Sequence, residues 1–161
     1  MTRAEKLLYR NERWMYRDGR PNRVATFLNR IWAMFASAGL GRRWLVTLEV
    51  RGRRSGRVIS APLIAADLGG ERYLVSMLGE RASWVANVRA AGGMAVLREG
   101  RSVPVKLVEV PVVERGPIIR RYLQVAPAAR SFAPLDWRAP DFEFDRVAAD
   151  YPVFRICPAE A

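Results

Sequence analysis

The residues best suited to chemistry lie together at positions 52 to 57, Gly-Arg-Arg-Ser-Gly-Arg. Glycines let the backbone come close to a ligand, and successive N–H groups in such a turn form a concavity that binds anions. Arg53, Arg54 and Ser55 add planar charged forks and a hydroxyl, which suit phosphate or carboxylate. The segment therefore predicts an anion-binding turn. The alternative is a solvated basic turn whose glycines serve only the backbone geometry.

The chain has no histidine and one cysteine, Cys157, among its 161 residues. This composition excludes a Ser-His-Asp triad, a Cys-His pair, a histidine metal site and an internal disulfide. The acidic residues are scattered. Asp141, Glu143 and Asp145 alternate with phenylalanines, which indicates a helix start or a solvated turn. An enzyme with so few reactive side chains needs a cofactor. The sequence assigns no catalytic residue and no metal ligand.

The net charge of +11 is unevenly distributed. Residues 1–57 hold 14 Arg and Lys against 4 Asp and Glu, whereas residues 58–161 are nearly balanced. Such an asymmetry predicts a surface for something anionic, such as a cofactor tail, a lipid headgroup or nucleic acid. No recognisable nucleic-acid motif accompanies it, so we expect no specific nucleic-acid partner.

The elements that position the turn are two strands, predicted at residues 44–50 and 58–66. Apolar residues alternate along the first strand, and Pro62 places the second strand at a sheet edge or bends it. Further strands are predicted at 72–77, 94–98, 102–110 and 151–156, helices at 82–90, 114–124 and 142–149, and irregular structure at 127–140. Hairpin-connected strands with a few helices indicate a small closed antiparallel sheet.

The first 40 residues predict two helices, at 3–17 and 22–39, within a single domain of 161 residues that also holds the sheet at 44–157. Their apolar faces either pack on the sheet or contact an anionic membrane surface. No apolar run approaches the roughly 20 residues needed to span a bilayer. The start of the chain has no signal-peptide pattern. We therefore expect a cytoplasmic protein, with peripheral membrane contact through the N-terminal helices as one option.

Four motifs in order carry a family resemblance. They are Gly-Arg-Arg-Ser-Gly with Pro62-Leu63, the Gly69-Gly70 turn, Val75-Ser76-Met77 before Gly79, and Trp84-Val85-Ala86-Asn87. The tail at 150–156 adds to them. Together they resemble the deazaflavin (coenzyme F420)-dependent nitroreductase and quinone reductase family. The resemblance implies an α+β fold, a split antiparallel β-barrel similar to FMN-binding proteins, with N-terminal helices and short flanking helices.

The resemblance also implies a function, hydride transfer from reduced F420 to an electron-poor small molecule, with a quinone as the first expectation. Trp84 contacts the cofactor ring or packs in the core, and Asn87 contacts the cofactor, fixes a loop or caps a turn. Leu78 and Arg54 depart from residues common in the family, and residues 130–140 lack its tyrosine-rich substrate segment, so nitro-prodrug reduction is not implied. The implied cofactor-binding residues are Arg53, Arg54, Ser55, Ile59, Ser60, Ala61, Pro62, Val75, Ser76, Met77, Leu78, Trp84 and Asn87.

Two other functions fit the same residues. An FMN-binding split-barrel oxidoreductase would use the same fold and a basic phosphate turn. A non-catalytic carrier of F420 would need no protein acid or base, and the sequence shows none. The sequence leaves the oligomeric state open.

Overall fold

A computed structural model of the protein describes residues 44–160. The helices predicted at 3–17 and 22–39, and the membrane contact predicted for them, lie outside the described residues. Within 44–160, no helix combines the length and the apolar character needed to cross a bilayer.

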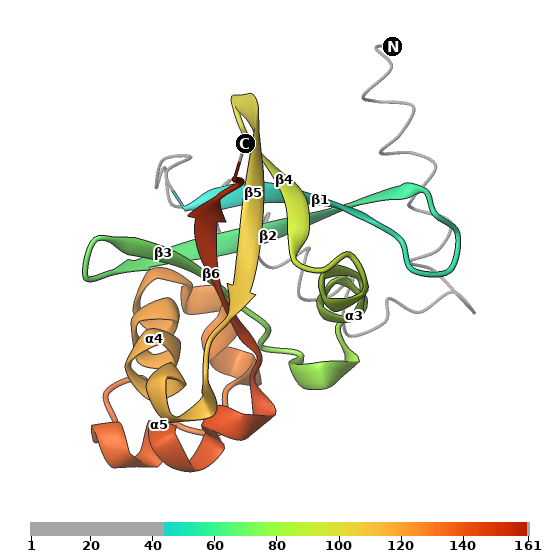
Figure 1. The fold of residues 1–161 in the computed structure, drawn as a ribbon. Coiled ribbons are helices and arrows are strands. Elements are labelled where there is room, and N and C mark those ends of the chain that lie inside the picture. The colour runs from blue at the N-terminus through green and yellow to red at the C-terminus, as the bar shows by residue number, and fades with distance from the viewer. Residues whose placement is uncertain (1–43, 161) are drawn as a thin grey trace.

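Six antiparallel strands close into a barrel in the order β1-β2-β3-β6-β5-β4, and β4 returns to β1 (Figure 1). The strands are β1 (Leu45–Arg51), β2 (Val58–Leu68), β3 (Glu71–Val75), β4 (Met94–Glu99), β5 (Arg101–Glu109) and β6 (Val153–Pro158). Hairpins join β1 to β2, β2 to β3 and β4 to β5, and residues 52–57 form the first of these connections. The α+β class and the split antiparallel barrel expected from the sequence are confirmed.

Helices lie at two places around this barrel. The α-helices of the described residues are α3 (Ser83–Ala90), α4 (Val112–Val125) and α5 (Asp141–Val147), and the 3-10 helices are η2 (Gly79–Arg81), η3 (Pro127–Phe132) and η4 (Ala148–Asp150). Helix α3 contacts β1, whereas α4 packs on β2 and against α5 (Figure 1). The predicted helix start at the alternating Asp141 to Asp145 segment is confirmed as α5.

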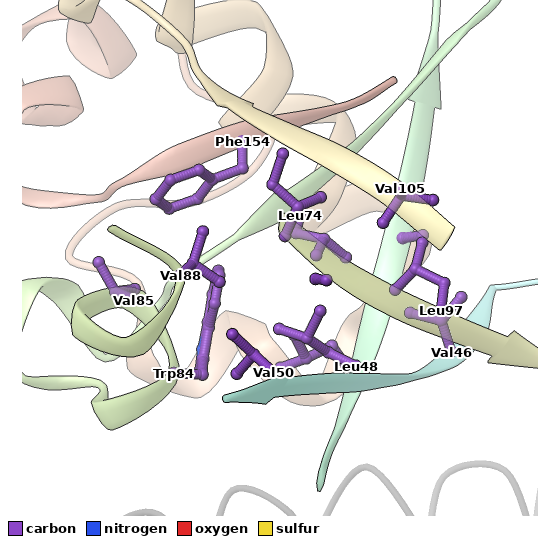
Figure 2. Packing of buried hydrophobic residues seen from close by; sticks show 14 of the residues in the cluster. Val46, Leu48, Val50, Leu74, Trp84, Val85, Val88, Leu97, Val105 and Phe154 are labelled. Carbon is purple, nitrogen blue, oxygen red and sulfur yellow. The ribbon is translucent and has the colours of Figure 1, made fainter. Parts of the chain in front are cut away.

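Apolar side chains from all six strands and α3 fill the barrel. Val46, Leu48 and Val50 alternate along β1 and are at most 3% exposed, as their spacing predicts. Figure 2 shows Val50 towards Trp84 of α3 and Val46 towards Leu97 of β4. We call this set the interior cluster: Val46, Leu48, Val50, Leu63, Ala65, Leu74, Ala82, Trp84, Val85, Val88, Ala95, Leu97, Val105, Leu107 and Phe154.

A second cluster lies between the outer face of the barrel and helices α4 and α5. Because side chains alternate along a strand, β2 sends Leu63 and Ala65 into the barrel and Ile64 and Ala66 towards α4. We call this set the helix-side cluster: Ile64, Ala66, Val75, Met77, Val110, Ile118, Ile119, Tyr122, Leu123, Ala126, Ala129, Phe144, Ala148 and Val153.

The first half of β2 is an open edge within the described residues. Residues 58–64 pair only with β1, and pairing with β3 starts at Ala65. The Ala65 N–H donates to the Trp44 carbonyl and the Gly52 N–H donates to the Arg57 carbonyl, so odd-numbered residues of β2 bond towards β1. The even-numbered Pro62 therefore faces the open side, where its missing N–H costs no ladder hydrogen bond. Within the described residues, the edge alternative predicted from Pro62 holds for this half of β2, whereas the second half pairs with β3.

The predictions for residues 72–77 and 127–140 need correction. The strand predicted to reach Met77 ends at Val75, because the Ser76 hydroxyl donates to the Gly79 carbonyl and the Gly79 N–H donates to the Ser76 carbonyl. These bonds turn the chain away from β6. The segment 127–140 is not irregular throughout, since η3 begins directly after α4 and Arg130 donates to the last carbonyls of that helix.

Candidate functional site

The turn at 52–57 has a backbone conformation that two glycines permit. The Gly52 N–H donates to the Arg57 carbonyl at 2.7 Å, and the Gly56 N–H donates to the Gly52 carbonyl at 2.9 Å. Gly56 has a φ of 67°, a region that residues with a side chain rarely adopt. A Cβ on Gly52 would lie 2.7 Å from Cδ1 of Ile59. The glycines therefore serve the turn geometry and hold the chain close to β2.

The turn carries positive charge that the described part of the chain does not neutralise. Seven other arginines of residues 44–160 form ion pairs with carboxylates. Arg51, Arg53, Arg54 and Arg57 form none with any described residue, although all four are exposed. Their charge is therefore available to an anion.

Free backbone donors accompany these arginines. Among the described residues, the N–H groups of Arg54 and Ser55 have no hydrogen-bond partner, whereas the Arg57 N–H donates to Oγ of Ser55 at 3.3 Å. Two successive unpaired N–H groups in a turn form an anion-binding concavity. Arg54 and Ser55 thus offer backbone and side-chain donors at the same point.

Arg53 differs from its neighbours because it contacts α3. Its backbone N–H and its Nη1 both donate to Oδ1 of Asn87, at 3.1 and 2.9 Å. Asn87 is 2% exposed. The structure therefore brings together two predicted site residues that are 34 positions apart, and it joins them to each other by hydrogen bonds.

The open edge of β2 begins directly after the turn and presents an apolar surface. Val58 is 68% exposed and Ile59 is 37% exposed, although both are large aliphatic residues. Ser60 is exposed, and Ala61 and Pro62 are half-buried. Since even-numbered residues face the open side, the backbone N–H and carbonyl of Ser60 have no strand partner within the described residues. The edge thus combines apolar contact with unpaired backbone groups.

The predicted site residues after β3 divide between the two clusters. Val75 and Met77 belong to the helix-side cluster and are each 4% exposed, so they offer little side-chain surface to a ligand. Ser76 is buried, and its hydroxyl hydrogen is used in the bond to Gly79. Leu78 is half-buried and packs against the interior cluster, on the same side as Ala61.

Trp84 lies in the barrel core. Its ring centroid is 5.6 Å from that of Phe154, at an interplanar angle of 60°, which is a favourable tilted arrangement. Figure 2 shows the indole between Val88 and Val50. Of the two roles predicted for Trp84, core packing is the one that these contacts support.

Ion pairs that the sequence analysis missed hold α3 in place. Arg89 donates to Glu80 of η2 and to Glu109 of β5. Arg115, which is buried, also donates to Glu109 and to the Val110 carbonyl. The hydrogen bond from Arg89 holds the pKa of the Glu80 carboxyl below its ordinary value. Arg57 was the other omission, although its place in the same glycine-flanked turn was a sufficient signal.

A shallow groove lies beside the turn, on the outer face of the barrel where β1 and β4 stop pairing. Their last pair is Glu49 with Val96. The groove has a volume of about 310 Å³, and its lining is mostly apolar. It is lined by Glu49, Val50, Arg51, Val58, Met94, Ala95, Val96 and Pro104. No cluster of three metal-ligating side chains occurs within residues 44–160.

The sequence matches the model of the F420H(2)-dependent quinone reductase family over residues 28–133. The chain belongs to that family. Coenzyme F420 is therefore its cofactor, and F420-dependent reduction is its general activity. No curated protein matches the sequence.

Solved structures with a similar fold are distant in sequence. An F420-H2 dependent reductase, FDR-A, is 19% identical, with 71% of this chain and 94% of that chain covered and a TM-score of 0.49. A domain-swapped dimer is 15% identical, with 96% and 99% covered and a TM-score of 0.50. An FAD-binding protein from Mesorhizobium loti is 17% identical, with 73% and 83% covered and a TM-score of 0.47. At these identities the likeness concerns the fold alone.

Proposed function

We propose that this protein transfers a hydride from reduced F420 to a quinone. The observation that carries the proposal is the Gly52–Arg57 turn together with the strand that follows it. The arginines of the turn have no carboxylate partner in the described structure, and β2 begins directly after the turn with exposed apolar residues. F420 has a deazaflavin ring, a ribityl-phosphate linker and a lactyl-oligoglutamate tail. An anionic linker and tail beside an apolar ring match this combination of charge and apolar surface.

The turn would hold the anionic part of the cofactor. Arg54 and Arg57 supply charged forks, and the free N–H groups of Arg54 and Ser55 supply backbone donors. Charge-assisted hydrogen bonds of this kind are shorter and stronger than neutral ones. The number of unpaired arginines exceeds what one phosphate needs, which favours F420 with its carboxylate-rich tail over FMN.

The open edge of β2 would hold the ring. Ile59 offers apolar contact, and the unpaired backbone groups of Ser60 offer a donor and an acceptor to polar atoms at the ring's edge. When bound, reduced F420 supplies the hydride that, together with a proton, reduces a quinone to its quinol. The side chains here bind and orient, and none of them needs to react covalently.

The groove beside the turn supports a quinone as the acceptor class. Its lining is mostly apolar, and Met94 is 48% exposed at its surface. A planar apolar molecule buries such a surface favourably. Arg51, which also lines the groove, offers a donor for a carbonyl oxygen of the acceptor.

The test starts with titrations of the purified protein with F420 and with FMN, followed by absorbance and fluorescence. We expect F420 to bind more tightly. Oxidation of reduced F420 is then followed against benzoquinones, naphthoquinones, a nitroaromatic compound and an enone. Turnover with quinones supports the proposal. Tight FMN binding without F420 binding contradicts it, and F420 binding without turnover of any acceptor identifies a carrier.

Met94→Glu tests the groove separately from the cofactor. A carboxylate at this position makes the groove polar, so we expect KM for a naphthoquinone to rise by about tenfold or more, while the Kd for F420 stays the same. Val113→Glu is the matched control, because Val113 is 85% exposed on α4 and does not line the groove. Equal effects of the two substitutions on KM would show that the acceptor binds elsewhere.

A further inference from the structure

We infer that Asn87 is a positioning residue that sets the shape of the cofactor-binding turn through Arg53. The two hydrogen bonds from Arg53 to Asn87, which we call the Arg53–Asn87 latch, are the only side-chain bonds that join the described turn to another element. The inference rests on the proposed function and deepens it. It assigns Arg53 to the turn's internal structure, although its sequence pattern predicts a cofactor ligand.

The geometry of the latch suits a fixed contact. One acceptor, Oδ1 of Asn87, receives both the backbone N–H and Nη1 of Arg53, so it restrains the main chain and the side chain of the same residue. Asn87 is 2% exposed, so the acceptor of these part-buried bonds is removed from water, although Arg53 itself is exposed. Loss of the acceptor would leave two donors unpaired at the base of the turn.

The latch separates the arginines of the turn into two roles. Arg53 is held against α3. The next two residues, Arg54 and Ser55, have free backbone N–H groups. Arg54 and Arg57 have no partner for their guanidinium groups among the described residues. The turn therefore presents its donors in a prearranged form, which lowers the entropy cost of binding an anion.

Helix α3 is a suitable anchor for the latch. Val85 and Val88, on either side of Asn87, are fully buried in the interior cluster. Two positions after Asn87, Arg89 joins α3 to Glu80 and to Glu109 of the barrel. Because α3 is fixed in the barrel, Oδ1 of Asn87 is fixed as well. Both Arg53 donors bond to this atom, so the start of the turn is held in place.

Two variants and one control test the latch. Asn87→Leu removes the acceptor at similar side-chain volume, and Arg53→Met removes the guanidinium. Val88→Ala is the control, because it loosens the packing of the same helix without touching either latch residue. The first readout is hydrogen exchange of the Arg53 amide in the cofactor-free protein. We expect this amide to exchange at least about tenfold faster in Asn87→Leu than in the wild type, and to change little in Val88→Ala.

The second readout is the Kd for F420, measured in about 0.5 M salt to screen longer-range attraction. We expect Asn87→Leu to raise the Kd about tenfold, and Arg53→Met to add less than about twofold in the Asn87→Leu background. Additive losses would show that Arg53 contacts the cofactor itself, and unchanged affinity in Asn87→Leu would overturn the inference. If the wild type does not bind F420, the proposed function fails, while the exchange of the Arg53 amide still decides whether the latch forms.

Discussion

Replacement of Arg54 by alanine is the sharpest perturbation of the cofactor site. The Arg54 side chain has no hydrogen bond or ion pair within the described structure, and the residue is exposed at the tip of the turn. Its removal should therefore leave the free energy of unfolding within about 0.5 kcal/mol of the wild type. Any larger effect must come from what the side chain binds in solution.

The size of the binding effect follows from the exposure of the turn. A hydrogen bond to a charged group contributes about 1.5 to 3 kcal/mol when water is excluded, and an exposed ion pair contributes less than about 1 kcal/mol. Arg54 lies between these limits once a cofactor covers it, which gives about 1 kcal/mol. This loss corresponds to a Kd for F420 about fivefold higher, since a tenfold change is about 1.4 kcal/mol.

Fluorescence titration with F420 at low and at high salt measures this effect. The difference between Arg54→Ala and the wild type should shrink at high salt, because the contact is partly screened. Arg101→Ala is the matched control, since Arg101 is exposed on the β4–β5 hairpin and pairs with no carboxylate of residues 44–160. If both variants weaken F420 binding equally, only the net charge matters and the assignment of the turn is wrong.

Three further predictions concern the elements that position the site. Trp84→Ala should lower the free energy of unfolding by about 3 to 5 kcal/mol in urea denaturation, because it empties the core beside Phe154; a loss below about 1 kcal/mol would contradict core packing. Gly93→Ala should destabilise the protein by about 1 to 3 kcal/mol, since Gly93 has a φ of 82° and the added Cβ would overlap the backbone carbonyl of Leu107 on β5; an unchanged thermal midpoint would mean that β5 shifts easily at Leu107. Glu80 has a lowered pKa in the folded state, so its contribution is present above its ordinary value of 4.5 and is lost as the pH falls through the folded-state value. In Glu80→Gln, the free energy of unfolding should therefore fall less steeply as the pH is lowered through the acidic range. An unchanged pH dependence would refute the ion pair with Arg89.

The sequence alone determined the local features of this protein. The alternation of Val46, Leu48 and Val50 was sufficient to identify the interior face of β1, because successive side chains of a strand point to opposite sides. Pro62 was sufficient to indicate an open edge, because it has no N–H to donate. The glycine-dependent geometry and the positive charge of the turn at 52–57 were likewise predictable, since glycines and arginines act through their own backbone freedom and charge.

Tertiary structure alone decided which of these features meet. Barrel closure pairs β1 with β4 and β3 with β6, and no local pattern specifies such distant partners. Val75 and Met77 pack in the helix-side cluster, although the family resemblance implies cofactor contacts for them. The position of α3 brings Asn87 to Arg53, and on this contact rests our proposal that Arg53 anchors the turn. The spacing of apolar residues shows which face of a single strand or helix is buried. The contacts between elements depend on how all of these apolar faces pack together in one fold.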